Sequence, residues 1–195
     1  MGEVKTALEK ALEKVKDIKG FSEEEKIEIK DREKVKMTLA SFFKGDIKKE
    51  EIVKGLKGIR NPLIIEAQMN LADLIRFNVS EEELYHKRDA IISLEMSKEH
   101  GDIVAVEEAL NVVQRILKEY NELREKAIKE VRSAIEENPH LRVRPVRLPD
   151  GRVIQAALSV EEALQERLSE FFEDHDRRYE RMLSRAVERL KNEFK

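Results

Sequence analysis

The chain has 195 residues, with 38 Lys or Arg against 41 Asp or Glu, so its formal net charge is -3. Charged residues make up 41% of the chain, against about 25% in an average soluble domain, and Cys is absent. The absence of Cys excludes disulfides, thiolate zinc sites, iron–sulfur clusters and cysteine nucleophiles. The near-neutral balance argues against a generally basic nucleic-acid-binding protein. Abundant Glu and Lys with little Gln give a composition that resembles that of thermophile proteins.

Neither a signal peptide nor a membrane span is expected. Residues 1–19 carry a charged side chain every few positions, so they lack the apolar core of a signal peptide. The longest apolar stretch is interrupted by Glu66, Asp73 and Arg76, and it is far shorter than the ~20 residues that a membrane span needs. We therefore expect a cytoplasmic protein that does not associate with membranes.

Helix starts are marked by three Ser-x-x-Glu patterns, which begin at Ser22, Ser80 and Ser159. In such a capping box the Ser hydroxyl accepts a hydrogen bond from the Glu amide, and the Glu carboxylate accepts one from the Ser amide. Pro62 marks a fourth start, and several glycines mark helix ends. The sequence therefore predicts an all-α protein of about seven helices, near residues 3–18, 22–44, 47–57, 62–77, 80–99, 102–137 and 160–194.

One small β-hairpin is predicted within residues 141–158, which break the helical pattern. Two runs rich in β-branched residues flank Asp150-Gly151, a dipeptide typical of hairpin turns. Pro145 has no amide hydrogen, so it confines the first strand to a sheet edge. Because a two-stranded ribbon alone is marginally stable, we expect it to pack on a helix or pair with the ribbon of a second copy.

The two long C-terminal helices are predicted to form an antiparallel helix–hairpin–helix arm, each helix being about 50 Å long at 1.5 Å per residue. The helix near 102–137 has apolar residues at alternating spacings of three and four, as in a coiled coil. Because further apolar residues lie on its neighbouring faces, we expect the chain to form a homo-oligomer, with a dimer favoured. The candidate self-association seam consists of Ile103, Val106, Leu110, Val113, Leu117 and Tyr120.

Composition also predicts a division of the chain near residues 58–61. Residues 1–60 contain fourteen Lys and two Arg, whereas residues 141–195 contain ten Arg and two Lys. We therefore expect a Lys-rich helical region over residues 1–60 and a helical body over residues 61–195 that carries the arm and the hairpin. One continuous domain is the alternative.

Few residue patterns point to catalysis or metal binding. Glu83 and His86 have the Glu-x-x-His spacing of a di-iron ligand pair, but the second such pair, Glu137 and His140, is interrupted by Pro139. The sequence contains no Gly-rich phosphate-binding loop and no Gly-x-Ser-x-Gly nucleophile elbow. We expect no cofactor, no metal and no enzymatic activity, and a carboxylate–histidine metalloprotein is the third hypothesis for the function.

Four arginines lie close together in the predicted hairpin, with only Asp150 opposing them. Guanidinium groups match the geometry of phosphate, so they form a candidate phosphate-binding site. No aromatic residue lies among them for base stacking, so nucleic-acid binding is expected to be weak. The alternative is that these charges protect the strand edges and pair with neighbouring Glu side chains. The four are Arg142, Arg144, Arg147 and Arg152.

Residues 165–172 read Gln-Glu-Arg-Leu-Ser-Glu-Phe-Phe. This segment resembles the PCNA-interacting box of sliding-clamp clients, Gln-x-x-aliphatic-x-x-aromatic-aromatic. The resemblance implies that Leu168, Phe171 and Phe172 would fill an apolar pocket of a clamp and that Gln165 would fill a polar one. The same spacing also fits core contacts of a helix that a capping box begins.

Together these patterns predict a non-enzymatic helical interaction or scaffold protein that self-associates through its long amphipathic helices. The alternative is a DNA replication or repair accessory protein that docks on a sliding clamp through residues 165–172.

Overall fold

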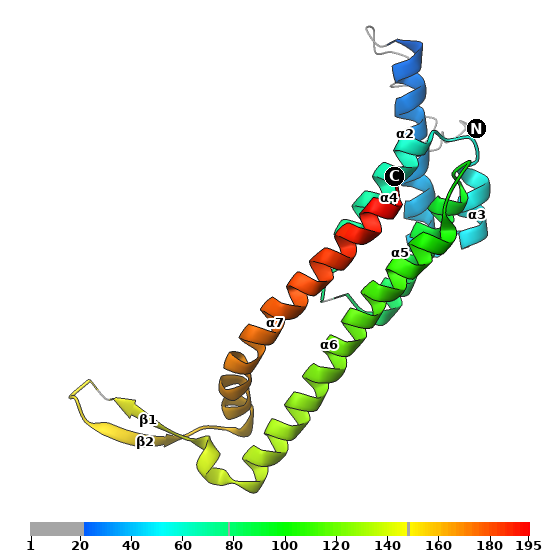
Figure 1. Ribbon diagram of the computed structural model, residues 1–195. Coiled ribbons are helices and arrows are strands. Elements are labelled where there is room, and N and C mark those ends of the chain that lie inside the picture. Colours follow the sequence, from blue (N-terminus) through cyan, green and yellow to red (C-terminus); the bar gives the residue numbers. More distant parts are fainter. Residues whose placement is uncertain (1–21, 78, 148) are drawn as a thin grey trace. The chain divides into compact units, whose positions relative to one another are not determined.

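The computed structural model describes residues 22–77, 79–147 and 149–195 (Figure 1). The predicted all-α class, with one small hairpin and two long, packed C-terminal helices, is confirmed. The helix predicted near residues 3–18 lies outside the described residues. The elements in chain order are α2 (Glu23–Phe43), α3 (Lys49–Gly55), α4 (Asn61–Asp73), α5 (Glu81–Met96), α6 (Ile103–Glu137), the 3₁₀ turn η1 (Pro139–Arg142), β1 (Val143–Arg147), β2 (Val153–Ala157) and α7 (Val160–Glu193).

Two of the three predicted capping boxes form completely, and they begin α2 and α7. Ser22 Oγ accepts from the Glu25 amide at 3.2 Å, and Glu25 Oε2 accepts from the Ser22 amide at 2.7 Å. At α7 the corresponding distances between Ser159 and Glu162 are 3.2 and 2.8 Å. These bonds satisfy amides that the first turn of a helix otherwise leaves without a partner.

The third capping box, at the start of α5, forms only in part. Ser80 Oγ accepts from the Glu83 amide at 3.1 Å, but the Glu83 carboxylate pairs with the ammonium of Lys87. The nearly buried Lys87 Nζ also donates to the carbonyl of Leu74 at 3.0 Å. This bond satisfies a carbonyl just beyond α4, which ends at Asp73 rather than near the predicted residue 77.

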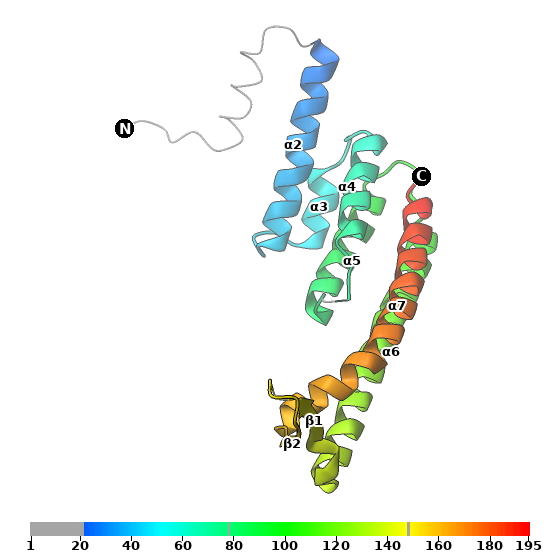
Figure 2. The same cartoon turned by 90° about the vertical axis from the view of Figure 1, so that its left-hand side faces the viewer.

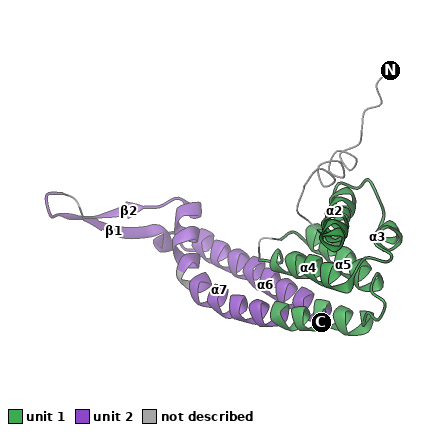
Figure 3. Cartoon of the chain, turned by 90° about the horizontal axis from the view of Figure 1, so that it is seen from above, with its two compact units in different colours: residues 1–110, 187–195 green, residues 111–186 purple. Residues whose placement is uncertain are grey.

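The chain divides into two compact units, residues 1–110 with 187–195 and residues 111–186 (Figure 3). Helices α6 and α7 contribute residues to both units. The boundary predicted near residues 58–61 lies inside the first unit, in which α3 and α4 both pack against α5 (Figure 2). In the described residues, no helix has the length and apolar content needed to cross a membrane.

The core of the first unit centres on α4, the most apolar helix. Its buried apolar residues are Leu63, Ile64, Ala67, Leu71 and Ala72. Helices α3 and α5 and the parts of α6 and α7 that belong to this unit add further buried apolar side chains. Helix α2 contributes a single fully buried residue, Val35, so it lies at the periphery of the unit.

In the second unit α6 and α7 pack side by side in antiparallel directions (Figure 1). The Tyr120 hydroxyl donates to Asp176 Oδ1 at 2.7 Å, and Arg132 pairs with Glu161 at 2.6 Å. Residue numbers rise along α6 as they fall along α7, which defines the antiparallel pairing. Near the hairpin, Ile135 is buried in a cluster with Ala163, Leu164 and Leu168.

The predicted hairpin is a two-stranded antiparallel ribbon in which Val143 lies opposite Ala157 and Arg147 lies opposite Val153. Gly151 in the connection has φ +86°, a left-handed conformation that glycine adopts without strain. The Asp150 carboxylate accepts from the Arg152 amide at 3.0 Å, which stabilises the turn.

Candidate interaction surfaces

The predicted self-association seam of α6 is covered within the chain. Val106, Leu110, Val113, Leu117 and Tyr120 are all buried, and Ile103 is partly buried. Among the neighbouring apolar residues, only Val104 is strongly exposed. Because apolar side chains that already pack within the chain offer little free surface, a second copy has little of this seam left to bind.

The clamp-like segment is divided between core and surface. Leu168 is 7% exposed and belongs to the buried cluster, and Phe172 packs against that cluster with the Arg124 guanidinium 5.5 Å from its ring centre. Phe171 is 38% exposed and stacks on His175 at a centroid distance of 4.1 Å, while Gln165 is exposed. The structure therefore does not bring the four residues to one free face.

Three of the four hairpin arginines are engaged by groups of the chain itself. Arg147 has no ion-pair partner among the described residues. One free guanidinium is a weak phosphate site, so the arrangement favours the alternative in which these charges protect the strand edges. The three contacts are Arg142 Nε to the Leu158 carbonyl at 2.9 Å, Arg144 to Glu166 at 3.5 Å, and Arg152 to Asp150 at 2.7 Å.

The candidate metal ligands lie apart from other ligating groups. Glu83 pairs with Lys87, and the His86 ring lies 6.1 Å from the ring of Phe42 in an edge-on arrangement. In the described part of the chain, no group of three or more His, Asp or Glu side chains is arranged to hold a metal ion.

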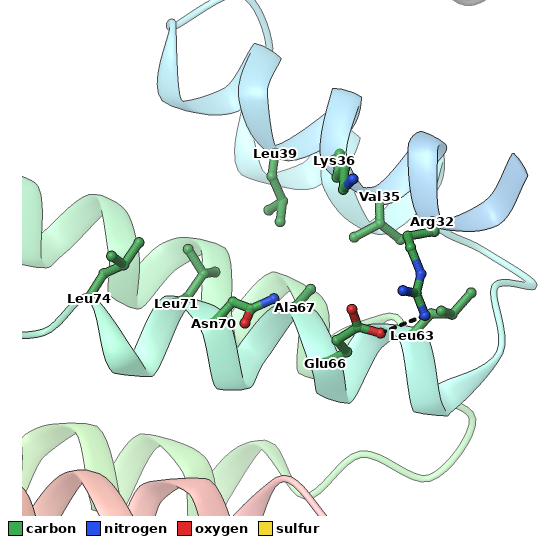
Figure 4. A pocket seen from close by; sticks show the side chains of 10 residues that line it. All are labelled: Arg32, Val35, Lys36, Leu39, Leu63, Glu66, Ala67, Asn70, Leu71 and Leu74. Atoms are coloured by element: carbon green, nitrogen blue, oxygen red, sulfur yellow. Dashed lines mark ion pairs between the residues drawn. The ribbon is translucent and has the colours of Figure 1, made fainter. Parts of the chain in front are cut away.

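An apolar groove of about 260 Å³ lies between α2 and α4 (Figure 4). Figure 4 shows Arg32 of α2 and Glu66 of α4 bridging the groove, where their charged groups are 3.0 Å apart. Lys36 and Asn70 complete a polar rim. Such a groove suits an apolar side chain flanked by polar groups. Its apolar lining consists of Val35, Leu39, Leu63, Ala67, Leu71 and Leu74.

The first unit contains a buried polar cluster that the sequence patterns do not predict. Glu95 is buried, and its Oε2 accepts from Lys98 Nζ at 2.6 Å and from Gln68 Nε2 at 2.7 Å, while its Oε1 accepts from the Asp102 amide at 3.0 Å. A Cβ atom at Gly101 would overlap the Glu95 carbonyl, so only glycine fits there. The one available signal was Gln68, a polar residue inside the most apolar helix.

Tyr120 connects the two long helices through a polar bond in a largely buried setting. Burial raises the pKa of the Tyr120 hydroxyl, and its hydrogen bond to Asp176 raises it further. The Tyr120 and Tyr179 rings lie 5.4 Å apart, so aromatic packing accompanies the bond. The carboxylate at residue 176 is thus a structural partner of Tyr120.

The β1–β2 ribbon presents the most open apolar surface of the second unit. Val143, Val153 and Ile154 are 42%, 62% and 46% exposed. Only Val146 and Ala156 are partly buried. The ribbon extends away from the ends of α6 and α7 (Figure 1).

The chain matches no protein-family model, no curated protein and no solved structure.

Proposed function

We propose that this chain is a non-enzymatic, cytoplasmic scaffold protein that binds other protein chains and self-associates, with a dimer as its basic assembly. The observation that carries the proposal is the β1–β2 ribbon, whose apolar side chains Val143, Val153 and Ile154 are exposed. A two-stranded ribbon is marginally stable in water, and its unpaired edges bind further strands readily. The ribbon thus replaces the α6 seam as the proposed contact between copies.

The packing of the long helices supports this assignment. Helices α6 and α7 use their own apolar residues against each other in the second unit, and the Tyr120–Asp176 and Arg132–Glu161 contacts fix their pairing. A firmly held pair of helices is a suitable base for presenting a ribbon to a partner, because sites built on regular elements are positioned more accurately than sites on loops.

Co-purification of two differently tagged copies tests the proposal. Capture through the first tag is expected to retain the second copy at micromolar concentration. The matched control replaces residues 143–157 with a short Gly-Ser loop in both copies and is expected to retain none. Recovery of the captured copy alone from the full-length pair would contradict self-association.

Docking on a sliding clamp remains the competing proposal, and it is supported by the exposure of Gln165 and Phe171. Leu168 is buried, so docking requires the first turns of α7 to leave their cluster. A pull-down with a purified sliding clamp tests this alternative. Clamp binding that is lost in both Gln165→Ala and Phe171→Ala would favour it, and no clamp binding by the unmodified chain would exclude it.

A further inference from the structure

The hydrogen bonds of the ribbon define which backbone groups point outward from β2. The Leu158 amide donates to the Arg142 carbonyl at 2.7 Å, so these two residues form a hydrogen-bonded pair. Hydrogen-bonded and non-hydrogen-bonded pairs alternate along an antiparallel ladder. With the observed register, Pro145 and Gln155 form a non-hydrogen-bonded pair, as the missing amide hydrogen of Pro145 requires. The amides and carbonyls of Val153, Gln155 and Ala157 therefore point away from β1.

These outward groups are free to bind another strand. All three residues are exposed, and no described residue forms a hydrogen bond with their outward amides or carbonyls. The five residues of β2 include neither a charged residue nor a proline. Proteins usually protect exposed strand edges with such residues, so the β2 edge is an unprotected one.

The outer edge of β1 is protected, in contrast. Its outward positions are Val143, Pro145 and Arg147, and the central one has no amide hydrogen to donate. Arg144 and Arg147 place two charges on this five-residue strand. The ribbon thus has one edge that opposes pairing and one that permits it.

We propose that β2 pairs in an antiparallel manner with β2 of a second copy, about a two-fold axis at Gln155, to give a four-stranded sheet with the two β1 strands outside. The inference rests on the proposed self-association and names the surface that mediates it. A two-fold axis makes the contact self-complementary and closed, as in most homodimers. This register uses all three outward residues, and each of these pairs exchanges two N–H···O bonds.

The side chains of β2 are compatible with this register. Val153 would lie opposite Ala157 of the partner subunit, and Ile154 would lie opposite Ala156 of the partner subunit, so a large apolar residue meets a small one on both faces. Gln155 would lie opposite its own copy, where two side-chain amides can exchange hydrogen bonds. No like charges oppose each other. Pairing of two β1 strands would instead place Pro145 opposite its own copy and remove the central hydrogen bonds.

Disulfide trapping tests the axis directly because the chain has no native cysteine. Gln155→Cys places the only thiol beside its copy, at a Cα separation of about 5.5 Å that suits a disulfide. The matched control is Val143→Cys, which leaves Pro145 in place and whose thiols would be separated by at least three strand spacings, or about 14 Å. Mild oxidation is expected to give a covalent dimer with Gln155→Cys and none with Val143→Cys.

Proline substitution tests the hydrogen bonds. Gln155→Pro removes an outward amide donor and leaves the bonds to β1 intact. Arg147→Pro removes an outward donor from the β1 edge, whereas the Val143 amide is already bound to the His140 carbonyl. Gln155→Pro is expected to raise the dimer dissociation constant by about tenfold or more, because both copies lose a donor at the centre of the contact. Arg147→Pro is expected to leave the constant unchanged.

Light scattering on the unmodified chain distinguishes failure of the proposed self-association from failure of the proposed β2 pairing. A dimer that is trapped at residue 155 and not at residue 143 supports both the self-association and the β2 edge as its contact. A dimer that is not trapped at residue 155, or that is trapped equally at both positions, overturns the β2 pairing and leaves the proposed function standing. A monomer at every concentration overturns both.

Discussion

Among single residues, Glu95 depends most strongly on the groups that surround it. It is a buried carboxylate, and three donors surround it, namely Lys98 Nζ, Gln68 Nε2 and the Asp102 amide. Lys98 Nζ also donates to the Phe194 carbonyl at 2.9 Å, so the cluster joins α5 to the end of the chain. A buried charge without a partner destabilises the folded state by more than the intact ion pair stabilises it. Removal of one member of a buried pair therefore lowers the free energy of unfolding more than removal of an exposed ion pair does.

Lys98→Ala is therefore expected to lower the free energy of unfolding by about 3–5 kcal/mol, because the Glu95 charge stays buried without its cation. Urea unfolding monitored by circular dichroism measures the change. The matched control is Lys118→Ala, which removes an exposed pair with Glu122 at 3.8 Å and is expected to cost less than about 1 kcal/mol. Equal effects of the two substitutions would contradict this account of the Glu95 cluster.

Tyr120 gives a pH-dependent contribution to stability. Its pKa in the folded state is raised, first by burial and then by the bond to Asp176, above an unfolded value of about 10. The neutral hydroxyl is favoured in the folded state, so the contribution is complete below pH ~10 and is lost as pH rises through the raised pKa. Tyr120→Phe is expected to cost about 1–2 kcal/mol at pH 8 and less at pH 11, measured by urea unfolding. A cost that does not change between the two pH values would contradict the assignment.

At the scale of the elements, the first turns of α7 place neighbouring residues of one motif in two environments, one buried and one exposed. Leu168 is buried and Phe172 packs on the same cluster, whereas Phe171 lies one position before Phe172 and points to a more open side. The interpretation of this segment as core contacts predicts that both aromatic rings are buried. Phe172 agrees with this prediction better than Phe171 does. Helical periodicity gives the reason, because adjacent residues differ in direction by about 100°.

Alanine substitutions along α7 are expected to follow this division. Leu168→Ala should lower the free energy of unfolding by about 2–5 kcal/mol, and Phe172→Ala by about 2–3 kcal/mol because its ring is only partly buried. Phe171→Ala and Gln165→Ala should each cost less than about 1 kcal/mol. Calorimetric melting measures all four. A loss at Phe171 as large as that at Leu168 would show that the ring is a core residue.

Helix positions follow from local chemistry, which is why the sequence predicts them well. The capping residues at Ser22 and Ser159 act within four residues of chain, so their pattern is visible in the sequence and both boxes form. The hairpin is likewise encoded locally, by the turn residues around Gly151 and by Pro145.

Tertiary partners are less visible in the sequence. The heptad pattern around Val113 and Leu117 indicates that another apolar surface covers them, but the same pattern arises whether that surface belongs to the same chain or to a second copy. The structure buries both within the chain. The Glu95 cluster was missed for a related reason, because Gln68 and Glu95 are 27 residues apart and only folding brings them together.

For the whole molecule, the distribution of covered and uncovered apolar surface decides which part meets a partner. The seam of α6 is already covered, and the β1–β2 ribbon is exposed on both faces. The proposed self-association therefore depends on the ribbon.

The most direct test of this claim is the mass in solution, measured by light scattering over a concentration series. The full chain is expected to give about 46 kDa, twice the chain mass of 22.8 kDa, and to fall toward the chain mass on dilution. The variant in which a short Gly-Ser loop replaces residues 143–157 is expected to stay at the monomer mass at every concentration. A full chain that remains a monomer throughout, or a ribbon-free variant that still forms a dimer, would contradict the account.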